Sequence, residues 1–495
     1  MRGPGFLRVF IFLLIFVLFI AYFLRFMAAP LSHDEQHYVS AGILVKSQVL
    51  YRDVDYLQTP YLPFIYCAGF DMTGVGHYLF KARTLTFLFL VLCSLALFFL
   101  LRRLSKDALL AGGGVFLFLV SSVMTRSAGW ADNNIPAMAF FVLACLFFAG
   151  GIEEEKPLKL FAGGFFLFCA TGIKLFYVLF LAPFLVVLFF FRRSPDGQTG
   201  ARAFFLGALL GFLPLVYFAI MYPRPFLFDN ITYHHLTALW LAGRGEGALL
   251  VWKASAHFLK RIFLFDPANA VFPALAALAL LFRRKPGSNA LQYGFFLFGV
   301  GLVLAGGLAL FVPRPLYIQH VVLILVPFLV LIAAAFCLLD APQKKVMRIA
   351  VLVFCLLSWL SNGMNVLSSF SAWRPQGWVP VRVAEIAVTL NREAGGLSGK
   401  VATLAPLFAL ESGAKIYGQF STGPFVYRLG KLVPPLGPVA PPVVVEELFR
   451  HDPPSLVLVG WEKDLDRPLE EYALAHGYVL LPGDRMGGRA YRRVR

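Results

Sequence analysis

Long apolar runs recur along the chain from Phe6 to Val366, and they constrain the fold more than any other feature. A run of about 17–25 apolar residues is long enough to cross the hydrocarbon core of a bilayer as a helix. Only 14% of the residues are charged, whereas a typical soluble domain has about 25%. The pattern predicts a multi-span integral membrane protein. It excludes a cytosolic enzyme, a disordered chain and a disulfide-stapled secreted domain.

We expect about eleven membrane spans, because apolar runs alternate with short polar loops. The first run, 6–26, is too long for the apolar part of a signal peptide, and Pro30 hinders cleavage after Ala29, so we expect an uncleaved helix. The fourth span follows Asn134 and ends near Gly151. The other expected spans are 83–101, 108–124, 158–171, 175–191, 203–222, 271–282, 290–312, 316–339 and 346–366.

Basic residues cluster in the short loops between these runs. They are Arg2 and Arg8; Arg102, Arg103 and Lys106; Lys156 and Lys159; Arg192, Arg193 and Arg202; Arg283, Arg284 and Lys285; and Lys344, Lys345 and Arg348. Such clusters mark the cytoplasmic side, and they explain much of the formal charge of +17. We therefore expect an inner (plasma) membrane protein with a cytoplasmic N-terminus. Three long polar segments, 27–81, 125–134 and 223–267, then share the opposite, outer face.

The chain is expected to have two parts. Residues 1–366 form a mainly α transmembrane module that carries the three outer segments. Residues 367–495 form a small extracytoplasmic α/β domain, with strands expected near 455–460 and 478–481 and short helices near 443–450 and 468–476. A proline-rich stretch, 433–442, is typical of a linker. The six cysteines lie almost entirely in apolar runs and predict neither a disulfide framework nor a CxxC metal site.

Two adjacent carboxylates, Asp34 and Glu35, stand just after the first span, between His33 and His37. Neighbouring residues on a helix point about 100° apart, so only one carboxylate can enter a given cavity. Three interpretations stay open. One carboxylate serves as a general base, the two histidines at i, i+4 spacing bind a metal, or Ser32 and the carboxylates cap a helix start.

Further polar residues gather in the segments expected on the same face. Asp132 is either the N-cap of the fourth span or a second carboxylate in a shared pocket. Lys174 and Arg83 are either interfacial cations or contacts for a lipid-linked phosphate. Loop residues that are weak signals alone are His234, His235, Tyr317 and His320. Their convergence on one face predicts a site there, and the chain has no P-loop or dinucleotide motif in a strand-to-helix context.

The order of these short motifs resembles the membrane-embedded GT-C glycosyltransferases, particularly the bacterial branch related to protein mannosyltransferases and to the aminoarabinose transferases of lipid A. The matching features are Asp34-Glu35 after the first span, the proline-containing stretch 58–63, Arg83 opening the second span, Asp132 before the fourth, Gly172-Ile173-Lys174 ending the fifth, and 317–320 before Pro327-Phe328-Leu329. The resemblance covers roughly residues 1–335.

This resemblance implies an inverting transfer of a sugar from a polyprenyl-phosphate donor to a lipid, glycan or protein acceptor of the cell envelope. Asp34 would be the catalytic base, with Glu35 orienting it or the acceptor. The donor phosphate would contact Lys174, Arg83 and His320, and the substrates would contact Asp132, His37, Gln58, His234, His235 and Tyr317. No cofactor is expected to be required, nor any nucleic acid partner, and a divalent metal at His33 and His37 stays open.

Two other classes of protein compete with this interpretation. A transporter or flippase of a lipid-linked or small solute would need polar residues near the middle of the bilayer, whereas the polar residues here concentrate at one surface. A structural membrane subunit would use the carboxylates and histidines only as caps and surface groups.

Overall fold

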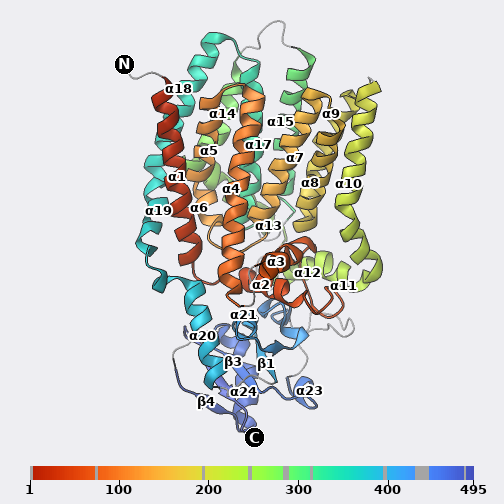
Figure 1. Ribbon diagram of the computed structural model, residues 1–495, viewed down its shortest axis with the longest axis vertical. Coiled ribbons are helices and arrows are strands. Elements are labelled where there is room, and N and C mark those ends of the chain that lie inside the picture. The colour runs from red at the N-terminus through yellow and green to blue at the C-terminus, as the bar shows by residue number, and fades with distance from the viewer. Residues whose placement is uncertain are drawn as a thin grey trace.

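The computed structural model describes residues 4–72, 76–191, 195–242, 248–282, 289–312, 316–393, 399–429, 445–483 and 486–494. A long helical bundle forms one end of the molecule and a small domain with a β-sheet forms the other, with short helices between them (Figure 1). The expected fold class, a mainly α polytopic membrane protein with a C-terminal α/β part, is confirmed. The expected linker 433–442 and the basic residues at 192–193 and 283–285 lie outside the described residues.

The bundle consists of α1 (Pro4–Ala28), α4 (Tyr78–Ser105), α5 (Ala108–Val120), α7 (Asn134–Glu154), α8 (Pro157–Ile173), η1 (Leu175–Phe180), α9 (Leu181–Phe191), α10 (Pro195–Met221), α14 (Pro267–Leu281), α15 (Ala290–Ala309), α16 (Ile318–Val321), η4 (Val322–Ile324), α17 (Leu325–Cys337) and α18 (Ala341–Ser358). Within the described residues, seven helices are long and apolar enough to span a membrane, or eight if one bent pair is a single span. Three shorter apolar helices complete the set. The count of eleven spans stays a prediction.

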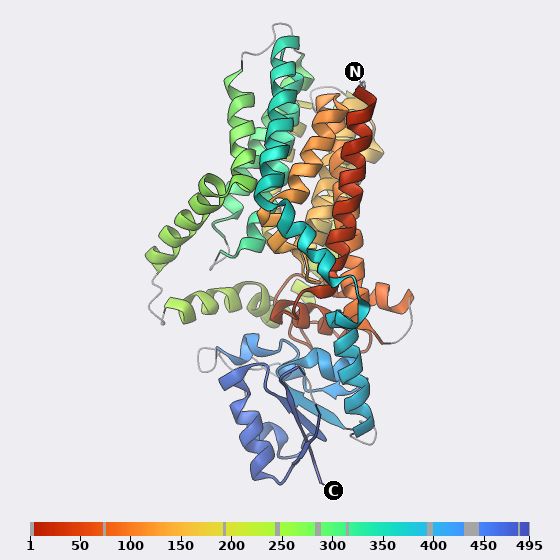
Figure 2. The same cartoon turned by 90° about the vertical axis from the view of Figure 1, so that its left-hand side faces the viewer.

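The three polar segments that are expected on the outer face contain several helices. The first holds α2 (His33–Leu44) and α3 (Tyr61–Met72), the second α6 (Ser122–Ser127), and the third α11 (Pro223–Leu227), η2 (Phe228–Thr232), α12 (Tyr233–Ala242), α13 (Ala248–Lys260) and η3 (Arg261–Phe265). The segment 223–267 contains residues 253–265, which pass the length and apolarity test for a membrane span together with α14, at a bend of 84°. Figure 2 shows α12 lying across the end of the bundle, above the C-terminal domain.

Helices α8 and α10 pack in very close contact because small residues line their interface. A Cβ atom added at Gly164 would overlap the carbonyl oxygen of Phe204, and one added at Gly207 would overlap that of Phe161. Small residues let helix backbones approach each other in this way in membranes, where packing rather than water exclusion drives association. This contact holds α8, and therefore Lys174 at its C-terminal end, in place.

After α18 the chain continues through η5 (Trp359–Gly363), α19 (Met364–Leu367), η6 (Ser368–Ala372) and η7 (Pro375–Gly377) into α20 (Val379–Glu393). The sheet then has the order β2-β1-β3-β5-β4, formed by β1 (Lys400–Thr403), β2 (Lys415–Ile416), β3 (Leu456–Val459), β4 (Val479–Leu481) and β5 (Arg489–Arg492). Strand β1 is parallel to β2 and β3, and β5 is antiparallel to β3 and β4. All four residues of β3 are buried, as expected for a continuous apolar strand in the centre of a sheet.

Short helices surround this sheet. They are α21 (Pro406–Glu411), η8 (Gly418–Phe420), α22 (Pro424–Tyr427), α23 (Val445–Phe449), η10 (Lys463–Asp466) and α24 (Arg467–Ala475). The basic ends of α4 and α18 lie at the opposite end of the bundle, where Arg348 of α18 pairs with Asp107 before α5 at 2.7 Å and Arg103 of α4 pairs with Glu153 of α7 at 2.8 Å. Basic loops and C-terminal domain thus lie at opposite ends of the bundle.

Candidate active site

One cavity of about 680 Å³ collects most of the residues expected to act. It lies between the C-terminal domain and the end of the bundle that faces this domain. The expected site residues that line it are Asp34, His37, Gln58, Lys174, His234, His235, Tyr317 and His320. Glu35, Arg83 and Asp132 do not line it. A larger, mostly apolar cavity of about 930 Å³ lies between α4 and α20 and holds none of the expected site residues.

The start of α2 separates the two adjacent carboxylates. The Ser32 hydroxyl accepts a hydrogen bond from the Glu35 backbone N–H at 3.1 Å, so the capping interpretation is correct for Ser32. With the helix fixed in this way, Asp34 lines the cavity and Glu35 is fully buried on another side. Capping and a functional role for Asp34 are therefore compatible.

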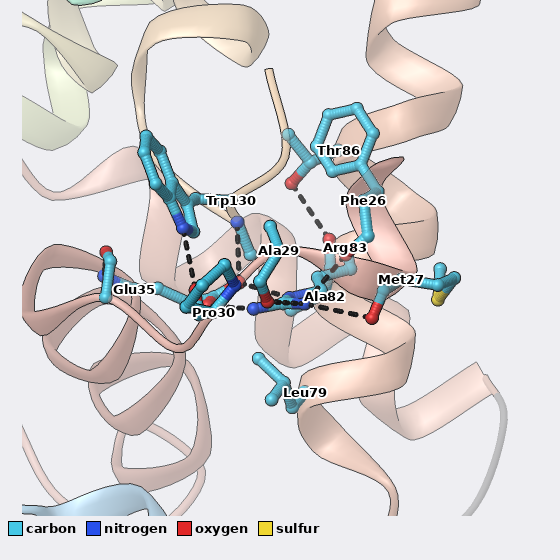
Figure 3. Close-up of polar contacts among 12 residues, drawn as sticks. Phe26, Met27, Ala29, Pro30, Glu35, Leu79, Ala82, Arg83, Thr86 and Trp130 are labelled. Carbon is cyan, nitrogen blue, oxygen red and sulfur yellow. Dashed lines mark hydrogen bonds and ion pairs between the residues drawn. The ribbon is translucent and has the colours of Figure 1, made fainter. Parts of the chain in front are cut away.

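Glu35 and Arg83 form a fully buried ion pair away from the cavity (Figure 3). Arg83 donates from Nε and Nη2 to the two carboxylate oxygens of Glu35, both at 2.7 Å. Its Nη1 donates to the carbonyls of Phe26 at 2.7 Å and Ala29 at 2.9 Å. The backbone N–H of Ala131 donates to Glu35 at 2.8 Å. This cluster ties the end of α1, the start of α2, α4 and the loop before α7 together.

The expected contact between Arg83 and the donor phosphate is therefore wrong for this structure. The guanidinium has no exposed surface, and its hydrogen bonds are used by Glu35 and by main-chain carbonyls. The sequence pattern of an arginine at the start of a membrane helix is the same whether the arginine binds a phosphate or forms an ion pair inside the protein. Arg83 and Glu35 are instead positioning residues for the outer loops.

Asp34 faces positive charges inside the cavity. Burial raises the pKa of its carboxyl above the ordinary value of 3.8, and the charges of Lys174, His33 and Arg428 oppose this shift. A carboxylate that is partly desolvated and still ionisable is suited to accept a proton. Asp34 and Lys174 thus interact electrostatically in the same cavity.

Lys174 follows the last residue of α8 and is buried. Its Nζ donates a short hydrogen bond to Asn134 Oδ1. Asp132 accepts from the Asn134 side chain at 2.7 Å and from its backbone N–H at 2.9 Å, so Asp132 lies behind Asn134 as seen from the cavity. Burial lowers the pKa of Lys174, which Asp132 and Asp34 oppose. The expected direct contact of Asp132 with substrate is corrected to support of Asn134 and Lys174.

Both His37 and His234 are held by the main chain of Leu57. His37 Nε2 accepts from the Leu57 N–H at 3.3 Å while its ring stacks on Tyr56, and His234 Nε2 lies 3.2 Å from the Leu57 carbonyl. Burial lowers the pKa of His37 to about 3, so its ring stays neutral. With Nε2 as acceptor, the ring proton lies on Nδ1, which is buried without a partner among the described residues.

The two histidines that bracket the carboxylates do not converge. His33 Nδ1 lies 2.8 Å from a carboxylate oxygen of Glu462 in the C-terminal domain, which raises the pKa of His33. Within the described ranges, no group of three or more His, Cys, Asp or Glu side chains is arranged to hold a metal ion. The alternative left open by the sequence, a metal held by both His33 and His37, therefore finds no assembled donor set among the residues described.

The remaining expected residues form the far wall of the cavity. His320 is half-buried and accepts from the Tyr317 backbone N–H at 3.5 Å, and its ring packs edge-on against Phe176. Tyr317 and His235 are exposed, and Gln58 is half-buried. All line the cavity, as the sequence predicted for one shared site.

Sequence reasoning missed several lining residues, among them Asn133, Asn134, Phe425 and Arg428. Asn133 and Asn134 adjoin Asp132, and two amides beside a carboxylate at the mouth of a span are a signal that could have found them. Phe425 and Arg428 come from the C-terminal domain, where no motif distinguishes them from other surface residues.

The chain is similar to a known protein family in part of its sequence and to solved structures in its fold. A sequence model of the family described as dolichyl-phosphate-mannose-protein mannosyltransferase matches residues 57–218. The structure is similar to ArnT from Cupriavidus metallidurans bound to undecaprenyl phosphate, with a TM-score of 0.58, 13% identity, and coverage of 99% of this chain and 98% of ArnT. The apo state of ArnT gives a TM-score of 0.56 and 12% identity at the same coverage. No curated protein sequence matches the chain.

The family match includes Asp132 and Lys174, and the likeness in fold extends through the C-terminal domain. Together, the comparisons show that the chain has the fold of ArnT over nearly its whole length, and that residues 57–218 match the mannosyltransferase family.

Proposed function

We propose that the protein is an inverting glycosyltransferase that moves a sugar from a polyprenyl-phosphate donor to an acceptor of the cell envelope at the outer face of the membrane. The observation that carries this proposal is that Asp34 and Lys174 line one cavity at the outer end of the bundle and interact electrostatically there. A base and a cation in one cavity are the two groups that a single displacement at an anomeric carbon requires.

In this reaction an acceptor oxygen attacks the anomeric carbon, and its proton passes to a carboxylate oxygen of Asp34. The bond between the anomeric carbon and the phosphate oxygen breaks in the same step, and the electron pair remains on the lipid phosphate. Charge therefore builds on that phosphate as the bond breaks, and the Lys174 ammonium stabilises it. One carboxylate is enough, because a single displacement forms no covalent glycosyl-enzyme intermediate.

The cavity wall next to Lys174 supports a lipid-linked donor. Leu175, Val178 and Val312 line the cavity and keep more than a third of their surface exposed. A prenyl chain could lie along these side chains with its phosphate at Lys174, since apolar surface of this kind gains free energy when covered. ArnT, which has a similar fold, binds undecaprenyl phosphate, a lipid of this chemistry. A transporter or flippase is not favoured, because the cavity lies at one end of the bundle.

The proposal is tested in a strain that lacks this protein, complemented with either wild type or Asp34→Asn. Mass spectrometry of lipid extracts should reveal an accumulated prenyl-phosphate sugar that wild type removes. Asp34→Asn should leave it in place, since loss of a general base slows the chemical step about 10²- to 10⁴-fold.

The matched control is Asp71→Asn, which changes an exposed carboxylate of the same outer segment that pairs with Lys46. This variant should clear the accumulated lipid as wild type does. Full clearance by Asp34→Asn at equal expression would remove Asp34 as the base.

A further inference from the structure

Arg428, at the end of α22 in the C-terminal domain, lines the same cavity as Asp34 and Lys174. Its guanidinium lies over the rings of Trp240 and Phe425, at 5.2 and 5.1 Å from their centres. Its Nη2 donates to the Tyr233 hydroxyl at 3.3 Å. No carboxylate of the described residues forms an ion pair with it, and its Nε is buried without a hydrogen-bond partner. A buried N–H donor of this kind costs free energy unless a ligand pairs with it.

The position of Arg428 is fixed by apolar packing between the outer loops and the C-terminal domain. Leu57, Phe228, Tyr233 and Leu429 form one buried cluster, against which Trp240 and Phe425 pack. Phe425 and Leu429, which lie just before and just after Arg428 in the sequence, thus pack on the segments that also carry His37 and His234. The guanidinium is held in place before any ligand binds, which reduces the entropy lost on binding.

The charged side chains that line the cavity include more cations than carboxylates, which favours the binding of an anion. Apart from histidines, they are the cations Lys174 and Arg428 and the carboxylate Asp34. Lys174 additionally has Asp132 close behind it, whereas the groups in direct contact with Arg428, which are Tyr233, Trp240 and Phe425, are neutral, and its charge acts on Asp34. A planar guanidinium with its faces covered by aromatic rings presents its N–H edge, and this edge matches the oxygens of a phosphate.

We infer that Arg428 binds a phosphate group of a substrate in this cavity, so that the C-terminal domain supplies part of the substrate site. The inference rests on the proposed function for the class of ligand. The phosphate belongs either to the prenyl donor or to the acceptor, and the experiment below separates these two sources.

The test measures binding by the purified full-length protein in lipid nanodiscs. The first probe is undecaprenyl phosphate, and the second is inorganic phosphate added to protein already saturated with undecaprenyl phosphate. The variants are Arg428→Gln, which removes the charge, and Arg428→Lys, which keeps the charge and loses the planar fork. Arg467→Gln is the control, because Arg467 is an exposed arginine of the same domain that pairs with Glu471.

If Arg428 holds the donor phosphate, Arg428→Gln should weaken undecaprenyl phosphate binding about 10- to 100-fold, which is the loss expected for charge-assisted hydrogen bonds. If it holds an acceptor phosphate, undecaprenyl phosphate binding should be unchanged and binding of inorganic phosphate to the loaded protein should fall by a similar factor. Arg428→Lys should fall between wild type and Arg428→Gln, with an unchanged thermal midpoint. Arg467→Gln should behave as wild type.

Unchanged binding of both probes in Arg428→Gln and Arg428→Lys would overturn the inference. The proposed function would survive that result as long as wild type binds undecaprenyl phosphate. Failure of wild type to bind undecaprenyl phosphate would remove the proposed donor. Binding of inorganic phosphate that is lost in Arg428→Gln would still support the inference on Arg428. Absence of both binding events in wild type would overturn the two together.

Discussion

Replacement of Arg83 by glutamine should destabilise the protein strongly and leave the substrate cavity chemically intact. The substitution removes the cation from a cluster in which Arg83 and Glu35 are both fully buried. The Glu35 carboxylate would keep one main-chain donor, the Ala131 N–H at 2.8 Å, and would lose two bonds of 2.7 Å. The carbonyls of Phe26 and Ala29 would lose their donor as well.

The expected cost follows from this loss of partners. Breaking a buried ion pair by removing one partner costs about 3–5 kcal/mol, because it leaves an uncompensated charge in a low-dielectric surrounding. For a chain of this size, that cost corresponds to a fall in the unfolding midpoint on the order of 5 °C. Glu35→Gln should cost a similar amount. The double variant should cost less than the two single variants combined, because it leaves neither charge unpaired.

Thermal unfolding followed by tryptophan fluorescence in detergent would measure these midpoints. Arg467→Gln is a suitable comparison, since the ion pair of Arg467 with Glu471 is exposed to solvent and therefore contributes little to stability. Binding of undecaprenyl phosphate at a temperature well below the midpoint is the second measurement. Arg83→Gln with a wild-type midpoint and a selective loss of undecaprenyl phosphate binding would refute the argument, and would return Arg83 to the donor site.

Two further predictions concern the cavity and the bundle. The value of kcat/KM should rise with pH as Asp34 ionises, and this rise should lie above the ordinary pKa of aspartate because burial raises the pKa of Asp34. At higher pH, kcat/KM should fall again as Lys174, whose pKa burial lowers to about 8, loses its proton. In Lys174→Arg the alkaline fall should disappear, because arginine stays charged; an unchanged alkaline limb would exclude Lys174 as the titrating group. Gly164→Ala should destabilise the protein by about 1–3 kcal/mol through overlap with the carbonyl of Phe204 on α10. Gly294→Ala, where an added Cβ meets open space, should leave the unfolding midpoint unchanged or slightly raised; equal effects of the two substitutions would contradict the close packing of α8 and α10.

The sequence was most informative where the relevant property is local. Hydropathy predicted the membrane helices, because a bilayer of fixed thickness requires apolar runs of a matching length. It did not single out 253–265, an amphipathic segment with lysine and histidine that passes the length and apolarity test only together with α14. The strand at β3 and the helices α23 and α24 also lie where local pattern predicted them.

Part of the site could be predicted from the sequence, and the part that could not has a physical reason. Asp34 and Lys174 share a cavity with His37, His234, His235 and His320, and all of them come from parts of the chain that the sequence placed at one face of the membrane. Two outcomes depend on neighbours far away in the sequence. Glu35 is kept out of the cavity by its ion pair with Arg83, and Arg428 is held at the cavity by packing on Trp240. By itself the sequence determined a membrane bundle with its reactive groups at one end, because transfer from water to lipid acts on each segment separately. Only the tertiary structure decided which charges are neutralised inside the protein and which stay available to a substrate, because burial and pairing of a charge depend on what the whole fold brings beside it.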